Sequence, residues 1–244
     1  MKRKSKRYIV VPLGFDYIFP NPRYAPKEGL LAYGGDLDPN RIIAAYKRGI
    51  FPWFNEGDPI LWWSPDPRLV LYPKELKVSK SFRRVLRNRE YKVVFDANFK
   101  EVIYNCAKIK RKGQRGTWLI EPMQEAYIEL FKRGFAHSVE VYEKDELIGG
   151  LYGLALGRAF FGESMFSLKK DASKIALKAL SDVLASRGYD FIDCQVPTDH
   201  LQRMGAKLIS RDQFLDELEE ALKKESDLGS WHNFRWEYKD ERDK

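Results

Sequence analysis

The stretch from residue 137 to residue 196 constrains the fold more than any other part of the chain. Strands are predicted at 137–143, 146–156 and 159–164. A short turn at Lys144 and Asp145 joins the first two. A helix is predicted over 171–187, beginning DASKIALKAL, and it leads to a strand with the sequence FIDCQV at 191–196. Antiparallel hairpins combined with helices and one crossover strand indicate a mixed α/β fold.

Shorter elements are predicted on both sides of this stretch. They are helices near 79–88, 97–109, 121–133 and 211–224, and a strand near 207–210. The tail from Ser226 onward carries Trp231, Phe234 and Trp236, which we expect to pack back on the body of the protein.

The segment from residue 18 to residue 68 is rich in turn formers and aromatic residues. Within it Asp38 can cap a short helix, Pro39 fits its first turn, and Gly49 suits its C′ position. The cluster SPDPR at 64–68 interrupts regular structure and marks a domain boundary. The domains that this boundary predicts are a small N-terminal α/β domain, residues 1–66, and a larger domain, residues 67–244.

Composition excludes several classes of protein. With 244 residues, 44% hydrophobic and 14% aromatic, the chain can bury a proper core and is not disordered. No apolar run approaches the ~18 residues that a membrane span requires. The basic start, MKRKSKRYIVVPLGFDY, lacks the apolar stretch and cleavage site of a signal peptide. The two cysteines and three histidines have no zinc-binding spacing, so we expect a cytoplasmic protein without a metal.

Positive charge is concentrated in one segment. The formal net charge is +8, and residues 80–115 alone hold 12 basic and 3 acidic residues. Four basic residues share one face of a predicted helix: Lys80, Arg83, Arg84 and Arg87. A second basic run, KIKRKGQR, follows at 108–115. This pattern favours a nucleic-acid phosphate backbone as the partner, with an ordinary solvated helix face as the alternative.

Several familiar catalytic signatures fail on their spacing. GGLYGLALG lies within a strand pattern and does not open a helix, so it is not a dinucleotide-binding fingerprint. GESMF at 162–166 begins like a nucleophile elbow but has Phe where the final Gly belongs. His137, His200 and His232 are scattered, and we expect each to be structural. Cys194 is a possible nucleophile, although a small buried thiol is the commoner case.

A series of longer strings occurs in order along the chain: EGLLAYGGDL, AYKRGIFPWF, PILWWSPDPR, GTWLI, AHSVEV, GGLYG, GESMFS, DASK and DCQ. Over residues 19–215 the chain closely resembles the bacterial leucyl/phenylalanyl-tRNA–protein transferases. Members of that family move Leu, Phe or Met from an aminoacyl-tRNA to the N-terminal Arg or Lys of an acceptor protein, which marks it for degradation by the N-degron pathway. The resemblance implies a small N-terminal domain followed by a domain like the GCN5-type acetyltransferases. Because the aminoacyl ester is already activated, the resemblance also implies that the reaction needs no cofactor and no metal.

By this resemblance, Asp193 and Gln195 are the catalytic pair. Extended geometry puts both on one face of the predicted strand, with Cys194 on the other. The Gln195 carbonyl oxygen can accept a hydrogen bond from the attacking amine, and Asp193 could hold the amide and favour positive charge on the nitrogen. The structural alternative is a strand-end carboxylate and amide that satisfy loop backbone.

Glu163 lies next to Phe160 and Phe161, where an unpaired carboxylate would be costly. A cationic partner explains it. By resemblance that partner is the basic N-terminal residue of the acceptor, and an internal salt bridge is the alternative.

The resemblance assigns the remaining roles to apolar and aromatic residues. It gives the donor side-chain pocket to Leu151, Phe160 and Ile192. It places Trp53, Trp118 and Tyr127 near the 3′-terminal adenosine of the tRNA. Stacking on an aromatic face suits an unpaired terminal base, although residues of both kinds are more often plain core. The family also has a basic cluster where the four basic helix residues lie, which implies contact with the tRNA backbone.

Two other functions remain open from the sequence. An acyl-CoA-dependent N-acetyltransferase on the same fold would need a Gly-containing pyrophosphate loop, and the corresponding stretch, SLKKDASK, has no Gly. A non-catalytic tRNA-binding module would explain the basic stretch but leaves Glu163 and the DCQ strand without a purpose.

Overall fold

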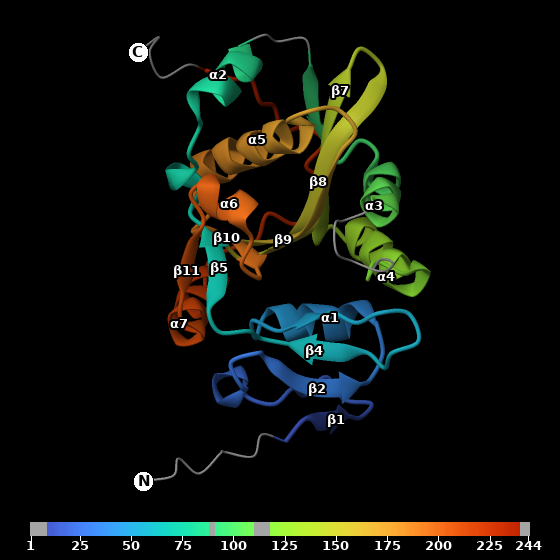
Figure 1. The fold of residues 1–244 in the computed structure, drawn as a ribbon. Helices are drawn as coiled ribbons and strands as arrows, with labels where there is room; N and C mark the ends of the chain where they lie inside the picture. Colours follow the sequence, from blue (N-terminus) through green and yellow to red (C-terminus); the bar gives the residue numbers. More distant parts are fainter. Residues whose placement is uncertain (1–8, 88–90, 110–117, 240–244) are drawn as a thin grey trace.

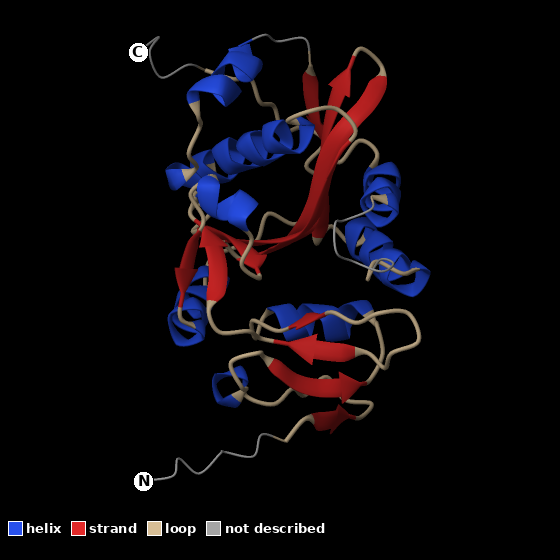
Figure 2. Cartoon of the chain, viewed as in Figure 1, coloured by secondary structure: helices blue, strands red, loops and turns tan. Residues whose placement is uncertain are grey.

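The computed structural model describes residues 9–87, 91–109 and 118–239. These residues form a four-stranded sheet near the N-terminus and a seven-stranded sheet in the rest of the molecule (Figures 1 and 2). The expected mixed α/β class is confirmed. Within the described ranges, no helix is long and apolar enough to cross a membrane.

The first sheet has the strand order β1-β2-β4-β3. Its strands are β1 (Val11–Leu13), β2 (Leu30–Gly34), β3 (Phe51–Pro52) and β4 (Leu61–Trp63). Helix α1 (Pro39–Tyr46) lies between this sheet and the rest of the molecule (Figure 1), and the 3-10 helix η1 (Pro22–Tyr24) precedes β2.

The caps of α1 agree with the sequence at one end and differ at the other. Asp38 accepts a hydrogen bond from the backbone N–H of Asn40, as expected of an N-cap. Gly49 has a φ of 71°, in the left-handed region. The C-cap is Lys47, however, so Gly49 lies one position beyond the predicted C′.

The second sheet has the strand order β11-β5-β10-β9-β8-β7-β6. Its strands are β5 (Arg68–Leu71), β6 (Lys92–Phe95), β7 (Ala136–Glu143), β8 (Glu146–Leu156), β9 (Ala159–Ser167), β10 (Phe191–Gln195) and β11 (Lys207–Ile209). Strands β9 and β10 pair in parallel, because α5 (Ala172–Ser186) crosses over between them, whereas the other neighbours are antiparallel. The predicted crossover is therefore confirmed.

Helices cover both faces of this sheet (Figure 1). Helix α5 packs on one face of β7 and β8, and α3 (Phe99–Lys108) and α4 (Glu121–Lys132) pack on the other. The remaining helices are α2 (Lys80–Arg87), α6 (Asp199–Arg203), α7 (Arg211–Leu222) and the 3-10 helix η2 (Pro73–Glu75).

Two buried clusters form the core. One joins the N-terminal sheet and α1 to the second sheet, and within it the Tyr46 ring packs edge-on to Phe161 with centroids 5.1 Å apart. The other lies beneath α5 and includes the C-terminal tail, where Trp231 is 1% exposed and stacks on the His137 ring at 3.7 Å. The expected packing of the tail on the body is confirmed.

Candidate active site

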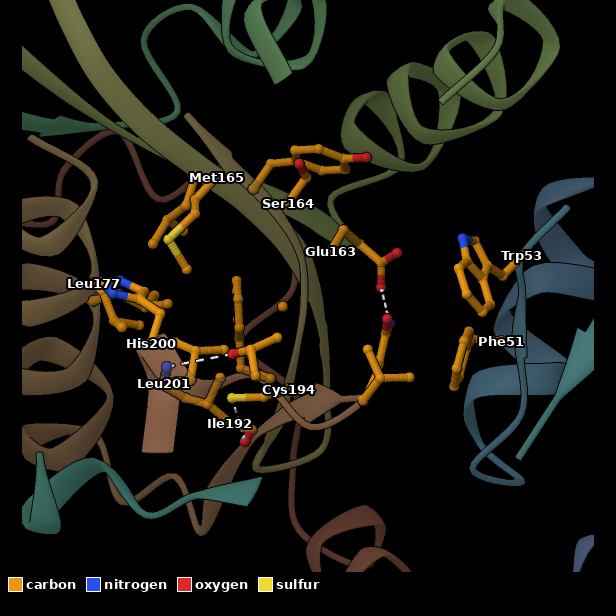
Figure 3. Close-up of a pocket in the computed structure, with 18 of the residues that line it drawn as sticks. Phe51, Trp53, Glu163, Ser164, Met165, Leu177, Ile192, Cys194, His200 and Leu201 are labelled. Atoms are coloured by element: carbon orange, nitrogen blue, oxygen red, sulfur yellow. Dashed lines mark hydrogen bonds between the residues drawn. The ribbon is translucent and has the colours of Figure 1, made fainter. Parts of the chain in front are cut away.

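A cavity of about 360 Å³ opens between β3 of the first sheet and the second sheet with α5 and α6 (Figure 3). Its lining residues are Phe51, Pro52, Trp53, Trp118, Leu151, Tyr152, Phe160, Gly162, Glu163, Ser164, Met165, Leu177, Leu180, Ile192, Cys194, Gln195, Val196, Thr198, His200 and Leu201. Both sheets therefore contribute walls to one site.

Many of the residues singled out from the sequence meet in this cavity. Those that line it are Trp53, Trp118, Leu151, Phe160, Glu163, Ile192 and Gln195. Asp193 and Tyr127 are fully buried and do not line it. Trp53 is 40% exposed, so part of its ring is open to solvent.

The apolar part of the cavity is larger than the sequence indicated. Beside the three predicted pocket residues, its walls include Met165, Leu177, Leu180 and Leu201. Leu177 and Leu180 are three residues apart on α5 and so share one helix face. That spacing is equally typical of helix core, so the sequence could not distinguish a pocket wall from packing.

Glu163 is held by hydroxyl and amide groups. It accepts hydrogen bonds from the Tyr46 hydroxyl at 2.7 Å, the Tyr127 hydroxyl at 2.8 Å and Gln195 Nε2 at 2.9 Å. Burial raises the pKa of the Glu163 carboxyl to about 7, against the lowering effect of these hydrogen bonds. The alternative of an internal salt bridge is therefore wrong, because Glu163 makes no ion pair among the residues that the structure describes.

Tyr127 occupies a different place from that expected of a base-stacking residue. Its ring is fully buried, and its hydroxyl lies against Glu163 and 2.7 Å from the Tyr46 hydroxyl. Burial raises the pKa of both phenols well above the ordinary value, so both remain protonated hydrogen-bond donors. Tyr127 therefore supports Glu163 from behind the cavity wall.

The end of β10 does not continue as a regular strand. Gln195 has a φ of 62°, and the register with β5 shifts between Asp193 and Gln195. The shift turns Cys194 and Gln195 toward the cavity together, while Asp193 stays buried in an ion pair with Arg68. The prediction that Asp193 and Gln195 share a face opposite Cys194 is wrong, because a local bulge breaks the alternation of side chains.

Cys194 has the environment of an inert thiol. Burial raises the pKa of the thiol well above its ordinary value, and Sγ donates to the Ile192 carbonyl oxygen at 3.7 Å. A thiol that stays protonated is a poor nucleophile, which favours the structural reading.

The three histidines lie in separate places. His137 is buried with Nδ1 2.9 Å from Asp96 Oδ2, and His232 is exposed. His200 lines the cavity, a role that its isolated position in the sequence did not reveal, and burial lowers its pKa. Among the residues that the structure describes, no group of His, Cys, Asp and Glu side chains could hold a metal ion.

The predicted basic face lies on α2, away from the cavity lining. Lys80, Arg84 and Arg87 are exposed and Arg83 is half-buried. The helix is held against α5, where Lys174 Nζ lies 5.9 Å from the Phe82 ring centre. Most of the second basic run, from residue 110 onward, falls outside the described residues.

Comparison with known proteins agrees with the family resemblance found in the sequence. The family model described as "Leucyl/phenylalanyl-tRNA protein transferase" matches residues 70–219, and the model of that family's N-terminal domain matches residues 35–66. The protein of that name from Maridesulfovibrio salexigens is 52% identical, over 94% of this chain and 96% of its own length. The one from Myxococcus xanthus is 51% identical, over 88% of this chain and 92% of its own length. Among solved structures, a GCN5-related N-acetyltransferase from Kribbella flavida is 10% identical with a TM-score of 0.37, covering 69% of this chain and 60% of that one.

Proposed function

The chain belongs to the leucyl/phenylalanyl-tRNA–protein transferase family, and from that membership we propose an aminoacyl transfer whose donors are Leu-, Phe- and Met-tRNA and whose acceptors begin with Arg or Lys. The product would carry a new N-terminal residue that marks it for degradation by the N-degron pathway. Because its aminoacyl-tRNA substrates are cytoplasmic, we propose the cytoplasm as the place of action.

One observation carries the proposal: the cavity combines an apolar region with a polar pair, Glu163 and Gln195. In Figure 3, Met165, Leu177 and Ile192 lie to one side of Glu163, and Trp53 lies to the other. An apolar donor side chain and a basic acceptor residue need these two environments next to each other.

The donor end of the tRNA would occupy the apolar region and the aromatic wall. Leu151, Phe160 and Ile192 would contact the amino-acid side chain. Trp53 and Trp118 line the same cavity and would stack on the terminal adenine. We propose Tyr127 as a support for Glu163 rather than as a third stacking ring.

The acceptor would bind through Glu163. At neutral pH its carboxyl is close to half-ionised, since its pKa is about 7. A guanidinium or ammonium group beside it would favour the ionised form and gain charge-assisted hydrogen bonds.

Gln195 would orient the nucleophile. Its Nε2 donates to Glu163 at 2.9 Å, which leaves Oε1 as an acceptor for the N–H of the attacking amine. The amine nitrogen forms a C–N bond to the ester carbonyl carbon, the ester C–O bond breaks, and one proton passes from nitrogen to the released ribose oxygen. Most of the acceleration would come from holding two substrates in contact.

The basic face of α2 would contact the tRNA backbone, since Lys80, Arg84 and Arg87 are exposed on it.

We also propose a domain boundary at residues 66–67. It falls between Trp63, where the last strand of the first sheet ends, and Arg68, where the first strand of the second sheet begins.

The test is incubation of the protein with Leu-tRNA and a peptide that begins with Arg, followed by mass spectrometry. The peptide should gain the mass of one leucyl residue at its N-terminus, and a matched peptide beginning with Ala should not. Absence of any mass gain would contradict the proposal, and acetylation with acetyl-CoA instead would establish the rival activity.

A further inference from the structure

Arg68, the first residue of β5, is a fully buried cation. Its Nε donates to Asp193 Oδ1 at 2.8 Å and its Nη2 to Oδ2 at 2.6 Å, in a bidentate pair with neither side chain exposed. Its Nη1 has no partner in the part of the chain that the structure describes. A buried pair with an unsatisfied donor is no more stabilising than apolar residues of the same volume, so stability alone does not account for it.

The Arg68 guanidinium is also fixed by two aromatic rings. It lies 4.8 Å from the ring centre of Phe51 on β3 and 4.4 Å from that of Phe214 on α7. Phe51 lines the cavity, as does Trp53 two residues further along the chain. Arg68 thus connects the first sheet, α7 and β10 at one point beside the site.

Asp193 transmits this constraint to Gln195. Its Oδ1 accepts the backbone N–H of Gln195 at 2.9 Å. Gln195 has a φ of 62°, which a residue with a Cβ adopts only where its surroundings hold it. The resulting turn directs the Gln195 side chain to Glu163 and the cavity.

We infer that Arg68 is a positioning residue for the transfer reaction, which acts through the Asp193 carboxylate on the backbone of Gln195. The inference rests on the proposed function of Gln195. Arg68 is fully buried and is not among the residues that line the cavity. Its role is to keep Asp193 in the one orientation that holds Gln195 in its left-handed conformation.

The same geometry excludes Asp193 as the acceptor of the amine proton. Both of its oxygens are bound by Arg68, it is fully buried, and it does not line the cavity. The proton lost from nitrogen therefore reaches the released ribose oxygen without passing through Asp193.

The first test is Arg68→Lys, which keeps the charge but loses the planar fork and the stacking. We expect kcat to fall by about tenfold or more, while the acceptor KM and the tRNA Kd change by less than about threefold. The matched control is Arg211→Lys. Arg211 is also buried, but the carbonyls to which its guanidinium donates are those of Ala25, Pro26 and Ser64, in the N-terminal part of the chain. It should lower the melting temperature and leave kcat unchanged; equal losses of kcat in both variants would overturn the inference.

The second test separates a local role from a general one. In a Gln195→Ala background, Arg68→Lys should change kcat by less than about twofold, because the group it positions is gone. Independent effects that multiply would overturn the inference. Should Arg68→Lys fail to fold, Asp193→Asn takes its place in the same cycle, with the same expected coupling.

The closing experiment does not depend on turnover. The side-chain amide resonances of Gln195 are identified by NMR from their absence in Gln195→Ala. In Arg68→Lys they should shift toward those of a solvent-exposed amide, and in Arg211→Lys they should stay in place. Unshifted resonances in Arg68→Lys would overturn the inference even if the wild type transfers Leu normally. A wild type that transfers nothing would instead contradict the proposed function alone.

Discussion

Glu163 is a carboxyl group that burial keeps close to its titration midpoint at neutral pH. Because its pKa is raised to about 7, the group is neutral below that pH and ionised above it. In the proposed role of Glu163, a basic acceptor residue would bind the ionised form, so acceptor affinity should depend on the ionisation of this side chain.

We expect the Kd of a peptide beginning with Arg to fall by roughly tenfold as the pH rises from about 6 to about 8. The Glu163→Gln variant should lose most of this dependence and discriminate poorly between Arg and Ala at the acceptor N-terminus. Isothermal titration at several pH values measures both. An identical pH profile in variant and wild type would remove Glu163 from the acceptor site.

Gln195 and Cys194 are neighbours that both face the cavity, yet they should differ sharply. Gln195→Ala removes the oxygen proposed to accept a hydrogen bond from the attacking amine, and it should lower kcat by about 100-fold with tRNA binding intact. Cys194→Ala should change kcat by no more than about threefold, because the thiol stays protonated. Single-turnover rates decide; inactivity of a folded Cys194→Ala would restore the nucleophile hypothesis.

Helix α5 sets the size of the apolar region through Leu177 and Leu180. Leu177→Trp fills part of a cavity of about 360 Å³ and should reduce use of Phe-tRNA more than use of Leu-tRNA. The kcat/KM ratio for the two donors measures the change. The acceptor KM should stay the same, and a change there instead would place the donor side chain elsewhere.

Helix α2 should supply affinity for tRNA without sequence preference, since phosphate contacts carry no sequence information. Arg83→Glu with Arg87→Glu should weaken every donor tRNA similarly and flatten the log–log dependence of Kd on salt by roughly 0.7–0.9 per lost contact. A short aminoacyl-adenosine donor should be used as before.

The control for α2 is the same charge reversal at Lys223 and Lys224, at the end of α7, where both lysines are partly exposed. This double variant changes the net charge by the same amount as the double variant of α2. If both double variants weaken tRNA binding to the same extent, the effect is one of net charge and not of α2.

The long elements were predictable from sequence, and several of the short ones were not. The strands between residues 136 and 167 and helix α5 follow the predicted bounds within a few residues, because each presents a regular pattern. Strand β5 is buried at all four positions and shows no alternation, and β3 has two residues, so neither was predicted.

The site was predictable by residue type but not by geometry. Motif resemblance named residues that do meet in one cavity, but simple alternation misjudged the end of β10. The φ of Gln195 depends on Asp193 and Arg68, and Arg68 is more than a hundred residues away in sequence. The alternation of side chains along a six-residue strand cannot reveal a contact with a residue so distant in sequence.

The C-terminal tail is part of the core of the protein. Trp231 stacks on His137, and its backbone N–H donates to Asp96 at 2.7 Å. Trp231→Ala should lower the free energy of unfolding by about 3–5 kcal/mol, because it leaves a large cavity beneath the tail. Urea denaturation measures the loss, with the exposed Leu228→Ala as a near-neutral control. A loss below about 1 kcal/mol would show that the tail packs only loosely.

The two sheets are joined by one core cluster that spans both, and the cavity lies between them. In the proposed function, this cavity holds a donor side chain and an acceptor cation in separate places, with Gln195 between them. Each place then has its own variant, Leu177→Trp for the donor and Glu163→Gln for the acceptor.

The most direct test is the single-turnover rate of transfer from Leu- and Phe-tRNA to competing peptides that begin with Arg or Ala, measured by mass for the wild type and these two variants. We expect that Glu163→Gln reduces the preference for Arg over Ala and leaves the Leu-to-Phe ratio unchanged, whereas Leu177→Trp does the reverse. If either variant shifts both preferences together, or neither variant shifts any, donor and acceptor do not occupy separate places in this cavity.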